Sequence, residues 1–477
     1  MASPVAAGAA EFGAKLASFV KENRLYGAAA GLVHGDELAW SGGSGFASLA
    51  AGQPAAPDVL YRIASITKTF TGTAIMQLRD IGALDLDDPV VKWIPELSDS
   101  ASPATIGGVT IRRLLSHESG LVSEPPGTDF LASEPSYEGR ASQNLARVAE
   151  IFTAVPPNTQ LKYCNLGYQL LGEIVQRASG IPYPEYVAGR ILTPLGMAST
   201  GFEPLPAALA GRRATGYAGR AFSDELAVAP VMPPVWAEGG LWSTVEDLGK
   251  WLSFQVAAHA DQAEYAGPES AGAAPDESAQ AGSAVLSSTT RREMHKPRYL
   301  SDEEWSSAWG ISWYSVRKDD VTWVQHSGGL PGFTSNACFD RSTGVGAIVL
   351  VNGVADASGL AMSLAAAGRG LAAAAAPQPR PLVATPADLA PLLGVYAPPD
   401  FSFLVTLEWR DGQLTLIDMS DPADKVVLNR AGEPGGFVVA PGVRSSGEAV
   451  EFRRLPDGSV ASLAYGGGRL VRLGPVA

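Results

Sequence analysis

Apolar residues recur at helical spacing in several stretches of the chain. Residues 9–24 and residues 66–80 each place their apolar side chains on one face, which predicts two amphipathic helices. Gly82 follows the second stretch, at a point where a glycine suits a helix C-terminus. Other helices are predicted at 109–121, 167–179, 186–192 and 357–376. We therefore expect residues 66–255 to be mostly helix and loop.

Short runs of β-branched and aromatic residues predict strands on either side of this helical region. Residues 27–40 predict two strands that turn at Gly35, followed by a loop through Gly42 to Gly45. Four later strands are predicted at 309–316, 321–326, 335–340 and 344–352. Early and late strands around a helical middle can join in one antiparallel sheet, which predicts an α/β (α+β) fold with a helical subdomain.

The last part of the chain has a different composition. Residues 377–384 begin with Pro-Gln-Pro-Arg-Pro, a stiff linker, and residues 385–477 contain short strand patterns separated by Asp-Gly turns. This predicts a small antiparallel β-barrel, similar to a lipocalin, after a first domain of residues 1–376. Within the first domain, residues 257–287 are low in apolar bulk and predict a mobile insertion.

Composition and charge exclude several classes of partner. Hydrophobic residues make up 46% of the chain and charged residues 18%, which is ordinary for a soluble protein. The 35 Lys and Arg against 49 Asp and Glu give a net charge of −14, which argues against nucleic acid and anionic membrane as partners. We find no apolar run long enough for a membrane span and no basic signal-peptide region, and so expect a cytoplasmic protein.

The cysteines and histidines indicate neither a disulfide framework nor a metal site. The chain has two cysteines, Cys164 and Cys338, and five histidines that form no H-E-x-x-H pattern and no cluster with cysteine. We expect Cys164 to be a small buried hydrophobe. His117 and Glu118 could form an acid/base pair. We expect instead that His117 caps a helix ending at Gly120 and that Glu118 faces solvent. The sequence thus predicts a protein with no metal and no cofactor.

The pattern S-x-x-K occurs three times, and its meaning depends on where it falls. Ser18–Lys21 lies within the N-terminal helix and Ser315–Lys318 lies on a predicted strand, where residues i and i+3 face opposite sides. Only Ser65 stands where a strand-like run meets a helix, so that Lys68 returns to the same face. A hydroxyl beside an amine that can lose its proton is an activated nucleophile. The alternative is a serine N-cap followed by a surface lysine.

Two further short patterns carry candidate chemistry. Tyr163-Cys-Asn165 is the only Y-x-N, and its phenol could relay a proton while its amide binds a substrate amide. The alternative is a packed tyrosine with an asparagine N-cap. His326-Ser327-Gly328-Gly329 contains the only H-x-G and ends a strand, where glycines let a backbone approach a ligand. The alternative there is a strand-end histidine before a glycine turn.

Together, S-x-x-K, Y-x-N and H-x-G resemble the motifs of the penicillin-recognising serine hydrolases. This family includes class C β-lactamases, DD-peptidases, D-aminopeptidases and related esterases. The resemblance covers residues 10–375 and includes stretches such as Thr-Ile-Arg-Arg-Leu-Leu-Ser-His-Glu-Ser-Gly-Leu (110–121) and Ala-Glu-Gly-Gly-Leu-Trp-Ser-Thr (237–244). It implies a sheet domain joined to a helical domain, with a site for a small molecule or peptide at their junction.

The resemblance also implies a role for each motif residue. Ser65 would be the acylated nucleophile. Lys68 and Tyr163 would share its deprotonation and the protonation of the leaving group, and which of them is the base stays open. Asn165 would orient the substrate. The backbone N–H groups of Ser65 and Gly329 would form the oxyanion hole, and His326, Ser327 and Gly328 would line the substrate on the same strand.

One departure from the family pattern bears on the substrate. Many β-lactamases of the family carry K-T-G where this chain has His326-Ser-Gly. A lysine is a permanent cation suited to a substrate carboxylate, whereas an unperturbed histidine titrates near pH ~6.5. We therefore expect hydrolysis of small esters or peptide amides through an acyl-enzyme. The alternatives are a β-lactamase or a penicillin-binding acyltransferase with little hydrolysis, and the C-terminal domain is where copies of the chain could associate.

Overall fold

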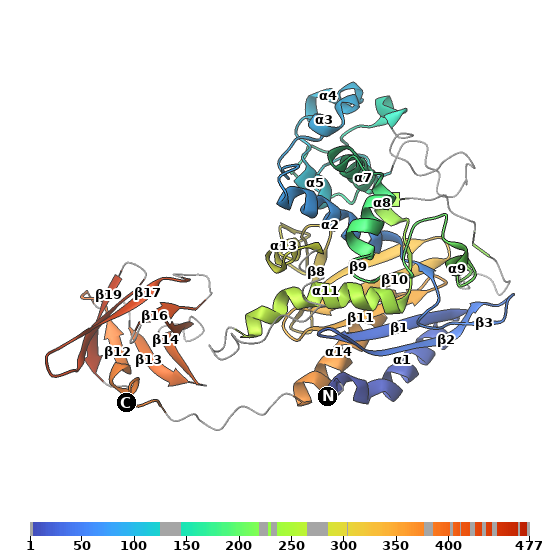
Figure 1. Ribbon diagram of the computed structural model, residues 1–477. Coiled ribbons are helices and arrows are strands. Elements are labelled where there is room, and N and C mark those ends of the chain that lie inside the picture. Colours follow the sequence, from blue (N-terminus) through green and yellow to red (C-terminus); the bar gives the residue numbers. More distant parts are fainter. Residues whose placement is uncertain are drawn as a thin grey trace. The chain divides into compact units, whose positions relative to one another are not determined.

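The structure is a computed structural model, and the chain divides into two compact units, Met1–Ala375 and Ala376–Ala477 (Figure 1). In the first unit it describes residues 3–124, 145–218, 228–229, 236–264, 285–302 and 304–375. In the second it describes residues 385–400, 404–410, 412–419, 425–431, 436–440, 446–465 and 468–474. In these ranges no helix is both long and apolar enough to cross a membrane.

A nine-stranded antiparallel sheet forms the centre of the first unit, in the order β3-β2-β1-β11-β10-β9-β8-β7-β6. Strand β1 pairs with β11, Ala28 opposite Val351, so that the two ends of the unit close one sheet as the sequence predicts. The strands are β1 Gly27–His34, β2 Glu37–Ser48, β3 Gln53–Pro54, β6 Tyr299–Leu300, β7 Ser307–Trp309, β8 Tyr314–Lys318, β9 Val321–Leu330, β10 Phe333–Asp340 and β11 Val345–Val351.

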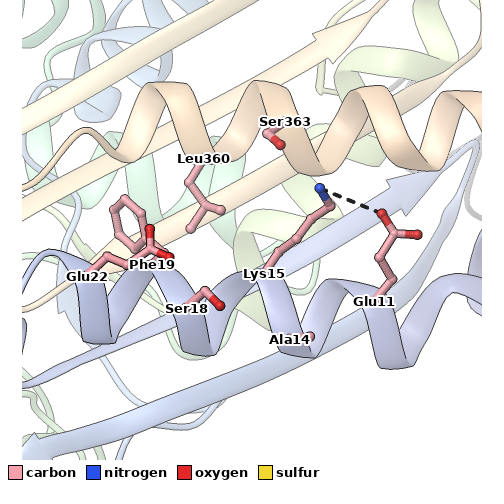
Figure 2. Close-up of a pocket in the computed structure, with 8 residues that line it drawn as sticks. All are labelled: Glu11, Ala14, Lys15, Ser18, Phe19, Glu22, Leu360 and Ser363. Atoms are coloured by element: carbon pink, nitrogen blue, oxygen red, sulfur yellow. Dashed lines mark ion pairs between the residues drawn. The ribbon is translucent and has the colours of Figure 1, made fainter.

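Helices cover both faces of this sheet (Figure 1). On one face lie α1 (Ala9–Glu22) and α14 (Ala357–Ala375), whose apolar residues pack with Val349 of β11. The groove between these two helices is open to solvent and is lined by Ser18 among other residues (Figure 2). On the other face α11 (Val245–Glu264) and the helical region pack with Ile348. Successive side chains of β11 point to opposite faces of the sheet, so this one strand contributes apolar residues to the core on each face.

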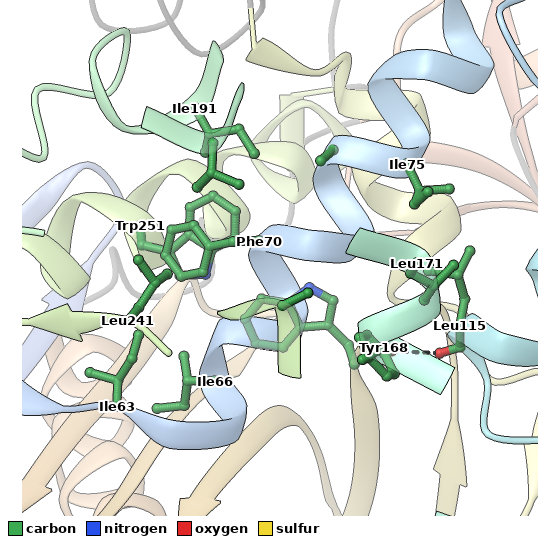
Figure 3. Close-up of a cluster of buried hydrophobic side chains, with 14 of the residues drawn as sticks. Ile63, Ile66, Phe70, Ile75, Leu115, Tyr168, Leu171, Ile191, Leu241 and Trp251 are labelled. Carbon is green, nitrogen blue, oxygen red and sulfur yellow. Dashed lines mark hydrogen bonds between the residues drawn. The ribbon is translucent and has the colours of Figure 1, made fainter. Parts of the chain in front are cut away.

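The helical region holds the elements that carry the S-x-x-K and Y-x-N motifs. Its elements are β4 Tyr61–Arg62, α2 Thr67–Asp80, α3 Val90–Trp93, α4 Pro103–Ile106, α5 Ile111–Leu115, α7 Asn165–Ser179, α8 Tyr183–Val187, α9 Ala207–Ala210, α10 Trp236–Gly239, β5 Trp242–Ser243 and α13 Ser288–Met294. Phe70 of α2 stacks on Trp251 of α11, with ring centroids 3.9 Å apart (Figure 3). Gly82 has a φ of 72°, as expected for a glycine just past the end of α2.

Several boundaries predicted from the sequence are wrong. The helix predicted at 109–121 spans only Ile111–Leu115, because the backbone turns left-handed at His117 and Gly120. The strand predicted at 309–316 is two strands, β7 and β8, separated by Gly310–Trp313. The loop predicted at residues 42–45 is part of β2.

The insertion predicted at 257–287 is also wrong at its start. Residues 257–264 continue α11, because a run rich in alanine favours helix even where it is poor in apolar bulk. Val285 and Leu286, at its other end, are buried. Residues 265–284 between them lie outside the described residues, as does the loop predicted at 125–140.

The second unit is a closed antiparallel barrel of eight strands, which confirms the predicted fold. The strands are β12 Gly394–Ala397, β13 Val405–Arg410, β14 Gln413–Asp418, β15 Lys425–Arg430, β16 Phe437–Val439, β17 Ala449–Arg454, β18 Val460–Tyr465 and β19 Gly468–Gly474. Its interior is a separate apolar cluster that includes Leu407, Leu416 and Leu463. The sequence prediction missed β12, which closes the barrel by pairing with β13 and β19. The linker predicted at 377–384 lies outside the described residues.

Candidate active site

Ser65 lies at a sharp turn between a short strand and a long helix. It is the middle residue of a 3-10 segment, Ala64–Ile66, which joins β4 to α2. Ala64 has a φ of 48°, in the left-handed region that residues with a Cβ rarely adopt. Such strain persists where the surroundings hold it in place. Here Ser335 of β10 donates a hydrogen bond from Oγ to the carbonyl of Ile63 at 2.9 Å.

Lys68 is fully buried in the first turn of α2, and three protein oxygens surround its amine. Its Nζ lies 3.1 Å from Ser65 Oγ, 2.8 Å from Asn165 Oδ1 and 2.7 Å from the carbonyl of Glu238. The last two oxygens can only accept, so they occupy two N–H groups of Lys68. The third position faces the hydroxyl of Ser65. An ammonium would donate there, whereas a neutral amine would present its lone pair to the Ser65 O–H.

Tyr163 places its ring beside the same amine. The ring centroid is 5.0 Å from Lys68 Nζ. The tyrosine is 37% exposed, and in the described part of the chain its hydroxyl forms no hydrogen bond with Ser65. The three groups of the predicted relay are therefore neighbours, and whether they pass a proton stays a prediction. Catalytic hydrogen bonds are often long in empty sites and shorten when substrate binds.

Asn165 connects Lys68 to a carboxyl group that the sequence analysis did not single out. Its Nδ2 donates to Glu124 Oε1 at 2.8 Å while its Oδ1 accepts from Lys68, so both ends of the amide have partners. Burial raises the pKa of Glu124. The alternative of an asparagine N-cap is wrong, because Cys164 is the N-cap of α7 and its Sγ accepts from the N–H of Gly167.

His326 of β9 is buried, and its ring is neutral at neutral pH. Burial, together with the charge of Lys68, lowers the pKa of His326 to about 3. The Nδ1 group lies 2.7 Å from the carbonyl of Ser327, which can only accept, so the proton of the neutral ring is on Nδ1. The Ser327 hydroxyl accepts a hydrogen bond from Tyr314 at 3.1 Å. This strand therefore presents no cationic side chain from the H-x-G motif.

The two glycines of the motif differ in their surroundings. A Cβ on Gly328 would lie 2.3 Å from the carbonyl of Ile63 and 2.4 Å from Ser335 Oγ. Strand β9 thus passes against the segment that leads into Ser65, and only a glycine fits at this point. A Cβ on Gly329 would meet no atom within 4 Å, and this residue is exposed. The H-x-G strand and the turn at Ser65 face one another across this contact.

The comparison with protein families identifies the chain. The model described as Beta-lactamase matches residues 12–371. The chain belongs to the beta-lactamase family. The resemblance read from the three motifs is thereby confirmed, and it extends over nearly the whole first unit.

Comparisons with curated proteins and solved structures show how far the similarity reaches. Penicillin-binding protein 4 of Amycolatopsis lactamdurans is 31% identical over 350 residues, which cover 70% of this chain and 82% of that protein. Esterase EstB of Burkholderia gladioli is 35% identical over 195 residues, which cover 38% of this chain and about half (48%) of the esterase. The octameric penicillin-binding protein homologue of Pyrococcus abyssi shares the fold, with a TM-score of 0.62, 22% identity and coverage of 97% of this chain and 99% of that chain.

Within this beta-lactamase fold, Glu238 is a second buried acid that sequence reasoning missed. Its main-chain carbonyl accepts a hydrogen bond from Lys68. Oε1 of its carboxyl group accepts another from Gln169, which follows Asn165 by one turn of α7. Burial raises the pKa of Glu238 to about 7. The signal in the sequence was the stretch 237–244, which supported the family resemblance without assigning this residue any chemistry.

The prediction for His117 and Glu118 is wrong. The α5 helix ends at Leu115, and His117 is fully buried beside Tyr163 rather than capping a helix. Burial, with the charge of Lys68, lowers the pKa of His117 well below its usual range. Glu118 is half-buried and accepts a hydrogen bond from the hydroxyl of Ser116.

The prediction of no metal rests on the sequence. Among the residues that the structure describes, no group of three or more His, Cys, Asp and Glu side chains could hold a metal ion.

Proposed function

We propose that this protein is a serine hydrolase that cleaves small esters or peptide amides through an acyl-enzyme. The observation that carries the proposal is the environment of Lys68. Its amine is buried, two of its positions are held by carbonyl oxygens, and the third faces Ser65 Oγ at 3.1 Å. An amine so held accepts a proton from one group only, the hydroxyl that would become the nucleophile.

The reaction follows in two acyl transfers. Ser65 Oγ attacks the substrate carbonyl while its proton passes to Lys68, directly or by way of the Tyr163 phenol. The C–O or C–N bond of the substrate breaks, and the leaving group takes up that proton. Water then attacks the acyl-enzyme by the same route, which releases the acid and restores the Ser65 hydroxyl.

Charge on the substrate oxygen develops at the start of each transfer. The backbone N–H groups of Ser65 and Gly329 are our candidates for its stabilisation, and removal of such a donor typically costs ~10²–10³ in rate. The open space at Gly329 supports this assignment, because a ligand can approach the backbone there. The contact between Gly328 and the Ile63 carbonyl would fix the two donors relative to one another.

The neutral state of His326 supports a substrate without a carboxylate in preference to a β-lactam. A β-lactam or a C-terminal peptide carries a carboxylate, for which a fixed cation is the natural partner. The low pKa of His326 leaves this strand without such a cation at neutral pH. A curated relative is named an esterase, which agrees with this preference, and another is named a penicillin-binding protein, which keeps the β-lactam alternative under test.

A substrate panel tests the proposal. One preparation would be assayed with p-nitrophenyl esters, D- and L-aminoacyl p-nitroanilides and nitrocefin, with Ser65→Ala as the control. We expect turnover of esters or aminoacyl amides well above that of nitrocefin, and none in the control. Nitrocefin turnover that rivals the best ester would make the protein a β-lactamase. A burst without steady-state turnover would make it an acyltransferase with little hydrolysis.

A further inference from the structure

His117 holds the main chain on both sides of Tyr163. The carbonyl of His117 accepts a hydrogen bond from the N–H of Lys162 at 2.8 Å. Its Nδ1 accepts a second hydrogen bond from the N–H of Cys164 at 3.1 Å. Lys162 and Cys164 are the two neighbours of Tyr163 in the chain. One buried residue thus fixes the backbone of the Y-x-N turn before and after its tyrosine.

The ring of His117 also packs on the Tyr163 side chain itself. The two rings stack with centroids 4.2 Å apart and an interplanar angle of 29°. Trp309 of β7 stands edge-on to both, with centroids 4.6 Å from His117 and 5.8 Å from Tyr163. The same Tyr163 ring lies 5.0 Å from Lys68 Nζ. The position of the phenol relative to this amine therefore depends on the His117 side chain.

These contacts require His117 to be neutral. Its Nδ1 can accept the Cys164 N–H only when that nitrogen carries no proton, which leaves the ring proton on Nε2. A protonated ring would place two N–H groups against each other. The groups that face the ring are Tyr163, Tyr168, Trp309, Lys68 and His326, none of which carries a carboxylate that would stabilise a protonated ring. The neutral form is thus the one that the surroundings favour.

We propose that His117 is a positioning residue that orients the Tyr163 phenol toward Lys68 and Ser65. This inference rests on the proposed serine hydrolase function, because it assigns Tyr163 a part in proton transfer. His117 contacts no reacting atom. It acts through three contacts with the Y-x-N turn: two hydrogen bonds to the flanking backbone and one ring stack. Its loss should therefore slow the chemical step while leaving substrate binding in place.

Two variants separate these contacts. His117→Asn keeps a hydrogen-bond acceptor and tolerates the left-handed backbone, whose φ is 61°, but it loses the ring. His117→Phe keeps a ring but loses the acceptor. The matched control is His295→Phe, because His295 is also buried, is packed edge-on against aromatic rings and hydrogen-bonds through both nitrogens, outside the site.

The measurement is kcat and KM for the best p-nitrophenyl ester, combined in a double-mutant cycle with Tyr163→Phe. We expect each His117 variant to lower kcat by about 10–100-fold with little change in KM, since small misplacements of catalytic groups have effects of this size. In the Tyr163→Phe background the same substitution should have almost no further effect, because the group that it positions is gone. The folded His295→Phe control should keep the wild-type kcat.

Two results would overturn the inference. One is wild-type kcat in a folded His117 variant. The other is a His117 effect that is equally large with and without the Tyr163 hydroxyl, which would indicate general destabilisation. If His117→Phe does not fold, the cycle with His117→Asn decides, since the smaller side chain crowds nothing. Failure of the proposed function is separate, because it would appear as full activity in Ser65→Ala.

Discussion

The chain carries one S-x-x-K copy within α1 and another that leads into α2, and the two copies differ in their surroundings. Ser18 and Lys21 lie on α1, where both residues are exposed to solvent. Figure 2 shows Ser18 on the wall of an open groove, one turn from the ion pair between Lys15 and Glu11. The other copy lies at the start of α2, where the lysine is fully buried and bonded to three protein oxygens.

The difference indicates that the S-x-x-K spacing brings the hydroxyl and the amine together, whereas the surrounding protein would make the pair reactive. Both copies set a hydroxyl and an amine three residues apart, one within α1 and the other across the 3-10 turn that enters α2. Lys21 is exposed, so water competes with the protein for the hydrogen bonds of its amine. Around Lys68 two carbonyl oxygens and one hydroxyl of the protein take the place of water. A change in the charge of the Lys68 amine therefore acts on the Ser65 hydroxyl with little screening by solvent. The packing of α2 against α7 and α10 therefore determines the surroundings of the lysine, which the four-residue motif alone does not.

Loss of the hydroxyl should give the largest contrast between the two copies. We expect Ser65→Ala to lower kcat on the order of 10⁴–10⁶-fold, as removal of the nucleophile does in serine hydrolases. Ser18→Ala should leave kcat unchanged. Both variants should fold, and p-nitrophenyl ester turnover beside a thermal melt checks this. Comparable activity in the two variants would remove the distinction between the copies.

Loss of the amine should give the next largest contrast. Lys68→Met should reduce kcat by about 10²–10⁴-fold, the usual contribution of a general acid–base group. Lys21→Met should behave as wild type, because water replaces its contacts at little cost. Steady-state kinetics on folded protein would measure both. A Lys68→Met variant with wild-type kcat would mean that the base is elsewhere, with Tyr163 the first candidate.

Two adjacent glycines extend the comparison to the sheet side of the site. Gly328→Ala should lower the free energy of unfolding by about 1–3 kcal/mol, since its Cβ would press on the Ile63 carbonyl and Ser335. Gly329→Ala should be close to neutral, because its Cβ would meet open space. Urea denaturation of both variants measures the difference. Equal losses would show that β9 does not press against the turn before Ser65.

The pH dependence of stability should show a further effect of burial on the titratable groups. Burial lowers the pKa of four histidines: His117, His259, His295 and His326. Below about pH 6.5 these histidines are protonated in the unfolded chain but stay neutral in the folded chain. Each of them therefore lowers the free energy of unfolding by at most ~1.4 kcal/mol for each pH unit of acidification. For His326 this loss continues toward its folded pKa of about 3.

Glu238 acts in the opposite direction. Because its pKa is raised to about 7 from the usual 4.5, the folded chain holds a proton that the unfolded chain releases between these values. Glu238→Gln removes this contribution and should make the loss of stability between pH 6.5 and pH 5 steeper. Urea denaturation across this range gives both slopes. A flatter slope in the variant would contradict the buried, protonated state of Glu238.

Local patterns predicted much of the fold where neighbours along the chain decide the conformation. The helix ending before Gly82 and the hairpin at Gly35 follow from short-range rules, and both glycines have positive φ. Strand β12, by contrast, has four residues and exists through its pairing with β13 and β19. The glycines at 42–45 have low strand propensity, yet Gly43 sits so close to the Ala55 carbonyl that no larger residue fits.

The candidate site likewise has residues that local motifs predicted and residues that only the packing of distant segments brings in. The motifs identified Ser65, Lys68 and Asn165, which the structure joins by hydrogen bonds. The partners Glu238 and His117 come from segments whose spacing carries no chemical pattern, and contact appears only when α10 and the turn after α5 pack beside α2 and α7. No sequence rule assigns a histidine to the tyrosine of a motif nearly fifty residues away.

The most direct test of the central claim is to find which serine becomes acylated. The protein would be treated with a fluorophosphonate, digested and mapped by mass spectrometry, with Ser65→Ala and Ser18→Ala treated in parallel. We predict one adduct, on the peptide that carries Ser65, absent from Ser65→Ala and retained in Ser18→Ala. An adduct on the Ser18 peptide, or full labelling of Ser65→Ala, would contradict the account.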